Sequence, residues 1–92
     1  MEWDERNEAH IAEHDVTPLE VDELVFEDAP HYRRGSGKNI YEVYGQTGAG
    51  RYLFVVLRSL GAHQARPITA REMTRSERRL YLRESKRKGG RR

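Results

Sequence analysis

Residues 51–58, Arg-Tyr-Leu-Phe-Val-Val-Leu-Arg, contain the only long uninterrupted apolar run in the chain. Six consecutive aromatic, β-branched or leucine side chains stand between two arginines, a composition typical of a β-strand that is buried on both faces. Successive side chains of a strand point to opposite faces, so the even-numbered residues should face one way and the odd-numbered residues the other. We therefore expect this segment to be the central strand of a sheet.

The size and composition of the chain indicate one small domain. It has 92 residues, of which 36% are apolar and 35% charged, and it has no cysteine. The absence of cysteine excludes disulfides, thiolate metal sites and cysteine nucleophiles. The N-terminus lacks the pattern of a signal peptide, and no segment approaches the roughly 18 apolar residues that span a bilayer. We therefore expect a soluble cytoplasmic protein without a membrane segment, with one domain over residues 1–86 and a basic flexible tail over residues 87–92.

The charge of the chain is divided unevenly between its two ends. Residues 1–30 hold eleven acidic residues and one arginine, a formal charge of −10. Residues 31–92 hold sixteen lysines and arginines and four acidic residues, a formal charge of +12. A basic surface of this size attracts polyanions. The alternative is that the two halves neutralise each other in the folded protein.

Helix signals lie at both ends of the chain. Asp4 is a good N-cap for a helix over residues 5–14. Thr17-Pro18-Leu19-Glu20 is a capping box with proline at the first helical position, and it predicts a helix over residues 18–27. A second capping box, Thr74-Arg75-Ser76-Glu77, predicts a C-terminal helix that ends near residue 86.

The middle of the chain reads as a meander of strands joined by short turns. A mobile loop rich in turn formers and bases is expected over residues 28–38. Pro67 weakens the third predicted strand and suits a position at a sheet edge or a strand start. These elements predict an α+β fold with two N-terminal helices, an antiparallel sheet of three to four strands and a C-terminal helix. The predicted strands cover residues 39–46, 51–58 and 64–71.

The predicted C-terminal helix and the strand before it carry a cluster of arginines. Spacings of three and four residues bring several of them near one another, and Tyr81 lies three residues after Arg78. Guanidinium groups match phosphate oxygens with paired hydrogen bonds, and a tyrosine ring can stack on an unpaired base, so single-stranded RNA is the expected ligand. The alternative is a solvated basic face. The cluster comprises Arg71, Arg75, Arg78, Arg79 and Arg83.

The predicted sheet carries three further arginines, Arg51, Arg58 and Arg66. If the strands 51–58 and 64–71 pair through the turn between them, Arg58 and Arg66 lie close together. Two neighbouring guanidinium groups are suited to the negative charge that develops on a phosphodiester during cleavage. Arg51 has an equally plausible role as a solvated residue at a strand end.

Two histidine and glycine patterns suggest other chemistry but have weak support. His10-Ile11-Ala12-Glu13-His14 matches the H-x-x-E-H pattern of some zinc peptidases. A catalytic zinc site needs a third protein ligand and a substrate cleft, which a short charged helix does not supply. We therefore expect no metal site, and His14 is a better candidate for a general acid or base. The glycines of residues 45–50 lie in a predicted hairpin rather than between a strand and a helix, which argues against nucleotide binding.

Several short segments, taken in order, resemble the BrnT-type toxins of type II toxin–antitoxin systems. Trp3-Asp4, His14 before Asp15-Val16-Thr17, and Gly50-Arg51 before the apolar strand carry the first part of this resemblance. Asp15 stands where the family usually has glycine. The most recognisable part is Arg66-Pro67-Ile68-Thr69-Ala70-Arg71, followed by Thr74 and Glu77-Arg78-Arg79-Leu80-Tyr81.

The resemblance implies a RelE-like fold, metal-independent cleavage of single-stranded RNA without a cofactor, and a prokaryotic cytoplasmic location. It also implies a partner antitoxin, BrnA-like and often DNA-binding, that neutralises the toxin. On this reading four arginines hold the scissile phosphate, His14 or Glu77 takes the proton of the attacking 2′-hydroxyl, and Tyr81 orients a base or the leaving group. The four arginines are Arg58, Arg66, Arg71 and Arg78, with Arg51, Arg75, Arg79 and Arg83 as further RNA contacts.

Two alternatives remain open from the sequence. The same basic face could serve a nucleic-acid-binding or protein-interaction module that has no catalytic activity. A zinc hydrolase is the third possibility. An RNA-cleavage assay without added metal separates the first two, and metal that copurifies with the protein would identify the third.

Overall fold

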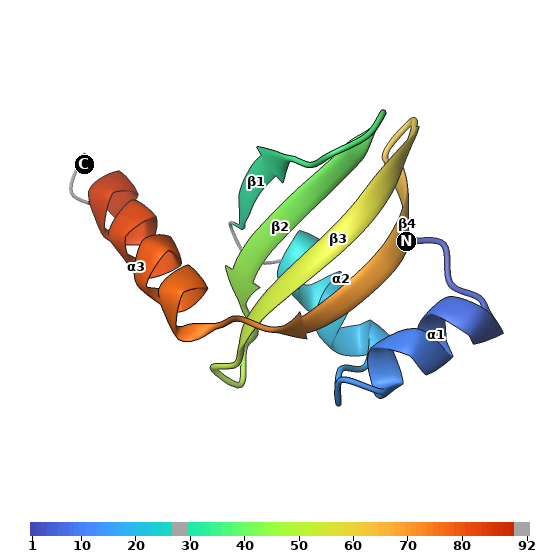
Figure 1. Cartoon of the computed structure of the whole chain (residues 1–92), viewed down its shortest axis with the longest axis horizontal. Coiled ribbons are helices and arrows are strands. Elements are labelled where there is room, and N and C mark those ends of the chain that lie inside the picture. The colour runs from blue at the N-terminus through green and yellow to red at the C-terminus, as the bar shows by residue number, and fades with distance from the viewer. Residues whose placement is uncertain (27–29, 90–92) are drawn as a thin grey trace.

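In the computed structural model, which describes residues 1–26 and 30–89 with side chains to residue 85, four antiparallel strands form one sheet. The strands follow one another across the sheet in the order β1-β2-β3-β4, so every neighbour pair is also consecutive in the chain. Two helices precede the sheet and one follows it (Figure 1). The predicted α+β class and element order are confirmed. The elements are α1 (Glu5–Ala12), α2 (Pro18–Phe26), β1 (His31–Arg34), β2 (Ile40–Gln46), β3 (Tyr52–Gly61), β4 (Gln64–Glu72) and α3 (Arg75–Gly89).

The helices begin where the capping signals predict. The Asp4 side chain accepts a hydrogen bond from the backbone N–H of Asn7 at 2.8 Å and caps α1. At the start of α2, the Glu20 backbone N–H donates to Thr17 Oγ1 at 3.2 Å, and the Thr17 N–H donates to Glu20 Oε1 at 3.0 Å. The same reciprocal pair joins Thr74 and Glu77 at α3. Each cap satisfies backbone N–H groups that have no partner inside the helix.

The first helix is shorter than predicted, because a reversal of the backbone ends it at Ala12. The Val16 N–H donates to the Ile11 carbonyl and the Asp15 N–H donates to the Ala12 carbonyl, which is the hydrogen-bond pattern of a Schellman motif. Asp15 has a φ of 58°, in the left-handed region where this motif usually has glycine. The turn sends the chain back, so that Ile11 and Val16 both enter the core.

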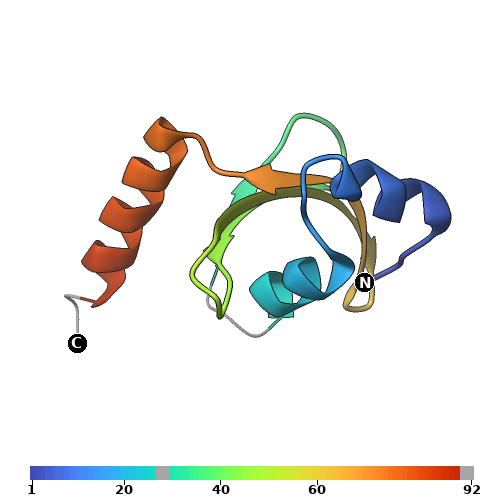
Figure 2. The same cartoon turned by 90° about the horizontal axis from the view of Figure 1, so that it is seen from below.

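Strand β3 supplies both faces of the sheet, as its sequence predicts. Its odd-numbered residues, Leu53, Val55 and Leu57, are buried in the main core with residues of α1 and α2. Phe54 faces the other way and forms a smaller cluster with Tyr44 and Tyr81. Figure 2 shows the sheet curved around α2, so the main core lies on the concave side. We call the other side of the sheet its open face.

Two expectations about the chain's organisation need correction. Residues 31–34 form strand β1 rather than part of a loop, because they pair with the outer edge of β2 in a ladder that runs from His31↔Tyr44 to Arg34↔Tyr41. Helix α3 continues to Gly89, so residues 87–89 belong to a helix and not to a tail. Residue 27 of the predicted second helix, residues 28–29 of the predicted loop and residues 90–92 of the predicted tail lie outside the described residues.

The third predicted strand behaves as its proline indicates. Strand β4 is an edge strand, and Pro67 is buried opposite Leu57 at a shift in register. A proline has no N–H to donate to the ladder, and an edge position with a register shift accommodates it. The Glu2 N–H donates to the Ala65 carbonyl and thereby covers part of this edge. Within the described residues, no helix is long and apolar enough to cross a membrane.

Candidate nucleic-acid interface

One row of cross-strand partners crosses the open face from β1 to β4. His31 lies opposite Tyr44, Tyr44 opposite Phe54, and Phe54 opposite Arg71. The rings of Tyr44 and Phe54 have centroids 5.0 Å apart, and the Arg71 guanidinium carbon lies 4.3 Å from the centroid of the Phe54 ring. Directly opposite residues of antiparallel strands share a face, so four strands place an imidazole, two aromatic rings and a guanidinium in one line.

Arg71 is held in place by Glu77 at the start of α3. Its two terminal nitrogens donate to the two Glu77 carboxylate oxygens at 2.8 and 3.0 Å. These bonds hold the pKa of the Glu77 carboxyl below its ordinary value, although partial burial opposes the shift. Glu77 therefore carries its negative charge at neutral pH, and this lowered pKa makes it a weak general base. A phosphate at Arg71 would compete with Glu77 for the same guanidinium edge.

Helix α3 lies against the open face through a small number of side chains. Tyr81 is 8% exposed, and its ring packs edge-on against His31 at 5.6 Å and Tyr52 at 6.0 Å between centroids. The Arg78 guanidinium carbon lies 4.7 Å from the centroid of the Tyr52 ring. The structure thus brings Arg71, Glu77, Arg78 and Tyr81 into one cluster. Because Tyr81 is buried, its ring also holds the helix to the sheet.

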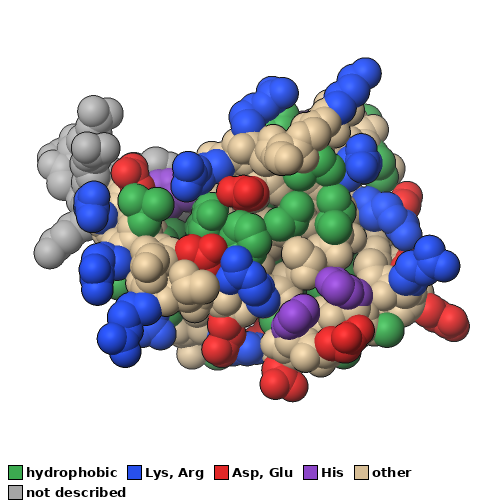
Figure 3. Space-filling view, viewed as in Figure 1, with side chains coloured by type: hydrophobic (Ala, Val, Ile, Leu, Met, Phe, Trp, Pro, Cys, Tyr) green, Lys and Arg blue, Asp and Glu red, His purple; other side chains and the backbone are tan. Residues whose placement is uncertain are grey.

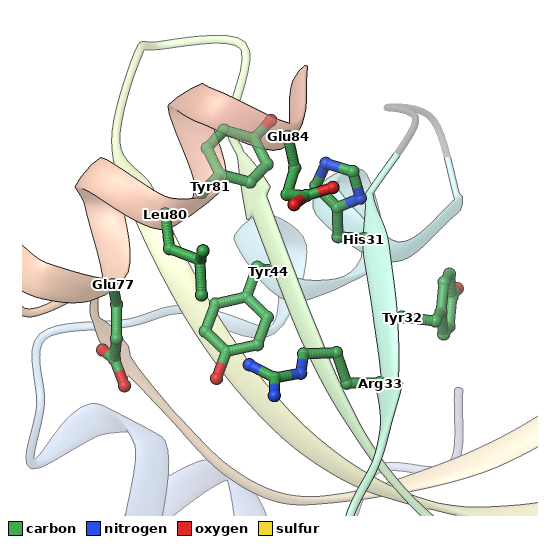
Figure 4. A pocket seen from close by; sticks show the side chains of 8 residues that line it. All are labelled: His31, Tyr32, Arg33, Tyr44, Glu77, Leu80, Tyr81 and Glu84. Carbon is green, nitrogen blue, oxygen red and sulfur yellow. The ribbon is translucent and has the colours of Figure 1, made fainter. Parts of the chain in front are cut away.

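A cleft of about 390 Å³ opens between α3 and strands β1 and β2. Figure 4 shows that the Glu84 carboxylate and the His31 ring point toward one another, with Tyr44 below them. Burial raises the pKa of the Tyr44 phenol, and the nearby Glu42 and Glu77 carboxylates raise it further. The cleft therefore holds an imidazole, a neutral phenol and carboxylates. Its lining consists of His31, Tyr32, Arg33, Tyr44, Glu77, Leu80, Tyr81 and Glu84.

Arg58 and Arg66 are cross-strand partners, as predicted, but the structure does not bring them into the cleft. Arg66 donates to Glu2 at 2.9 Å and also forms an ion pair with Asp4, so it ties the N-terminal segment to β4. Arg58 is exposed and reaches the Lys38 carbonyl at 3.4 Å. The acidic N-terminal segment, which is distant in sequence, thus neutralises one of the expected phosphate ligands.

Arg51 and His14 also lie outside the cleft. Arg51 donates to the Glu20 carboxylate at 2.9 Å and to Glu72 at 3.1 Å, so it links α2 to β4. The His14 ring packs against that of His10 with centroids 5.6 Å apart. The ring of His10 lies 3.0 Å from Thr69 Oγ1. His14 is exposed in the turn that follows α1.

The remaining predicted RNA contacts lie on the exposed side of α3. Arg75, Arg79 and Arg83 are exposed, as is Arg78. Figure 3 shows apolar side chains gathered along the middle of the open face, with basic side chains around them. The exposed arginines around this face suit contacts with phosphate groups, whereas the rings of Tyr44, Phe54 and Tyr81 are each only 8–9% exposed.

Sequence reasoning missed His31, Arg33 and Tyr44 as residues of the site. The signal was present in the alternation of residues 31–34, where the first and third side chains share one face of a short strand. The turn formers on both sides hid that alternation. The partner of His31 could not be read from the sequence at all, because it depends on the register of β1 against β2.

The described residues contain no group of three or more His, Cys, Asp or Glu side chains that could hold a metal ion. The rings of His10 and His14 pack against each other, and the His10 ring also lies beside the Thr69 hydroxyl. Comparisons with protein-family models, with curated proteins and with solved structures find no match to this chain.

Proposed function

We propose that the open face binds single-stranded RNA and cleaves it without a metal ion, as the resemblance to BrnT-type toxins implies. The observation that carries this proposal is the row from His31 to Arg71 beside the cleft under α3. It brings an imidazole, two aromatic rings and a guanidinium group into one patch.

In the proposed complex, Arg71 and Arg78 bind the phosphodiester. Both guanidinium groups lie over rings, Arg71 over Phe54 and Arg78 over Tyr52. A guanidinium that is already oriented loses little side-chain entropy when it binds phosphate. These charges would offset the negative charge that develops on the phosphorus oxygens as the RNA 2′-hydroxyl attacks.

A partner antitoxin and a prokaryotic cytoplasmic location belong to the same proposal. The resemblance supports a BrnA-like antitoxin. An acidic segment of that antitoxin that covers the basic open face would inhibit the protein by competing with RNA. A small reading frame next to the gene would support this pairing.

A non-catalytic nucleic-acid-binding module is the second candidate, and one observation favours it. Two of the four arginines expected to hold the phosphate, Arg66 and Arg71, already pair with carboxylates. Binding could then use only the exposed arginines of α3 and the rings of the open face. Such a protein would bind RNA without cleaving it.

The test is incubation of the purified protein with a short single-stranded RNA in low salt and EDTA. The proposal predicts fragments that end in a 2′,3′-cyclic phosphate, and Arg71→Gln and Arg78→Gln should each lose cleavage while circular dichroism stays unchanged. Arg6→Gln, which removes an exposed arginine from α1, is the matched control and should cleave normally.

Binding measured against salt concentration counts the phosphate contacts in either candidate, and the formation of fragments separates the two. Each phosphate contact to a single strand contributes about 0.7 to the slope of log K against log salt, so Arg78→Gln should lower the slope by about that amount. A gel shift with intact RNA would support the binding module. If the protein neither binds nor cleaves RNA at low salt, the proposal is overturned.

A further inference from the structure

We propose that His10 and His14 form a surface site for one divalent transition-metal ion of the kind that binds imidazole, such as Zn²⁺ or Ni²⁺. They are the two histidines of the H-x-x-E-H pattern, which the proposed function leaves without a role. Their rings pack edge-on with centroids 5.6 Å apart. Neither residue lines the cleft under α3, so this inference does not depend on RNA cleavage.

The spacing of the pair suits two ligands of one ion. Residues four apart in helical backbone lie on the same side, one turn above the other. The backbone keeps this pitch beyond Ala12, because Glu13 is helical (φ −63°, ψ −21°) and the His14 N–H donates to the Ile11 carbonyl at 2.9 Å. A zinc ion lies about 2.0–2.1 Å from each imidazole nitrogen that binds it. Rings that are already in contact need only small side-chain rotations to bind one ion together.

The core holds the backbone of this site in place. Ile11, which lies between the two histidines, is fully buried, and its carbonyl accepts a hydrogen bond from the Val16 N–H at 3.1 Å. The reversal at Asp15 therefore fixes the backbone under both rings, while the side chains of His10 and His14 remain exposed. Ligands on a fixed backbone lose less conformational entropy on binding than ligands on a mobile segment.

Thr69 on β4 supplies an outer partner for one of the two ligands. Nε2 of His10 lies 3.0 Å from Thr69 Oγ1. In the tautomer that donates from Nε2 to this hydroxyl, Nδ1 keeps the lone pair that a metal ion binds. Histidines that bind metals usually donate their other N–H to a neighbouring group, which fixes the tautomer and the ring. Thr69 is thus a positioning residue for His10.

The charges around the pair favour a cation. His10 lies in the last turn of α1 and His14 directly after it, where the helix dipole places partial negative charge. Glu13 and Asp15 flank His14 in the sequence, and both are exposed. Figure 3 shows two neighbouring histidine side chains on the surface with acidic side chains beside them. A divalent ion is therefore attracted by its surroundings as well as by its two ligands.

Two imidazoles make this a binding site and not a catalytic zinc centre. A catalytic zinc takes three protein ligands, and the described residues contain no group of three that could hold an ion. The sequence predicts no metal site for that reason, but a site with two protein ligands and water does not need the third. The folded backbone holds the two rings together and the unfolded chain does not, so the ion should stabilise the folded protein.

The test is isothermal titration calorimetry of the full chain, without a histidine tag, against ZnCl₂. One ion per chain should bind, and MgCl₂ should not bind because Mg²⁺ prefers oxygen ligands. His10→Gln and His14→Gln should each lose about 10²-fold in affinity, because one remaining imidazole no longer chelates the ion. Thr69→Val should lose about tenfold. His63→Gln changes an exposed histidine in the β3–β4 turn and, as the matched control, should bind as the wild type does.

Thermal unfolding followed by circular dichroism supplies a second readout. Zn²⁺ at about 100 times the wild-type Kd should raise the Tm of the wild type by at least about 4 °C. The same concentration should leave the Tm of His14→Gln almost unchanged. Spectra of the variants that match the wild type without metal will show that the substitutions at these exposed positions preserve the fold.

The outcomes decide between a built site and other modes of binding. Zinc that binds wild type, His10→Gln and His14→Gln with equal affinity would overturn the site, as would a wild type that binds no zinc. Half an ion per chain would show that two copies share the ion and would overturn a site within one chain. Unchanged affinity in Thr69→Val would overturn the role of Thr69 alone. RNA cleavage in EDTA tests the proposed function separately, because that assay contains no free metal ion.

Discussion

Gly45 lies where the sheet and helix α2 approach closely, and replacing it with alanine should separate them. Gly45 lies opposite Leu53 on the core side of β2. A Cβ atom added there would lie 2.7 Å from Leu24 Cγ and 3.1 Å from each Leu24 Cδ atom. Leu24 is fully buried, and the nearest atom is its branch point rather than the end of a flexible chain. The helix itself must therefore shift to relieve the contact.

The size of the effect follows from the cost of overpacking a core. Inserting a carbon into a well-packed interior costs about 1–3 kcal/mol. For a domain of this size each kcal/mol lowers Tm by about 4–8 °C, so Gly45→Ala should lower it by at least about 4 °C. Gly48→Ala is the matched control, because its Cβ would meet only the carboxylate end of Glu23, at 3.3 Å. It should change the free energy of unfolding by less than about 0.5 kcal/mol.

A double-mutant cycle with Leu24→Ala tests the mechanism. Leu24→Ala alone should cost about 2–5 kcal/mol, because it leaves a cavity between α2 and the sheet. In that background the new Cβ of Gly45→Ala enters the cavity, so the second substitution should be neutral or stabilising. Urea denaturation followed by circular dichroism gives all four free energies. Gly45→Ala that is equally destabilising in both backgrounds would refute the clash with Leu24 as the cause.

Two further predictions concern the end of α1 and the start of α3. At Asp15, whose φ is 58°, Asp15→Gly should retain or raise stability and Asp15→Val should lower it by about 1–2 kcal/mol in urea denaturation; equal stability of the two variants would contradict the left-handed requirement. The pKa of Glu77 is depressed below its ordinary 4.5, so the charged Glu77–Arg71 pair stabilises the fold above pH 4.5 and this contribution is lost as pH falls through the lower folded value. Glu77→Gln should therefore be less stable than wild type by about 1 kcal/mol at pH 7, and a deficit that persists undiminished at pH 2 would refute this origin.

Much of the fold could be predicted because its signals are local. The three capping residues or boxes at Asp4, Thr17 and Thr74 each join groups three residues apart, so the sequence alone specifies them. The apolar run of β3 is also a local signal, and it predicted that this strand is buried on both faces of the sheet. The pairing of Arg58 with Arg66 followed from the short turn between their strands. Strand β1 was missed, because four largely polar residues form a strand only when the edge of β2 is beside them.

The candidate site could be predicted only in part. The segment from Arg71 to Tyr81 is contiguous, and its cluster of Arg71, Glu77, Arg78 and Tyr81 follows from one strand end and the first turns of one helix. The neutralisation of Arg66 by Glu2 and Asp4 could not be foreseen, because it joins residues more than sixty positions apart. The same holds for His31, whose place in the cleft depends on its packing against Tyr81.

The sequence by itself determined where the helices begin, which strand is central and that arginines gather near the C-terminus. Those features depend on interactions within a few residues, or on a pattern that a single element carries. Only the tertiary structure decided which charges neutralise one another and which side chains share the cleft. Those outcomes depend on strand register and on where α3 lies against the sheet, and both are set by the sum of many weak contacts between distant segments.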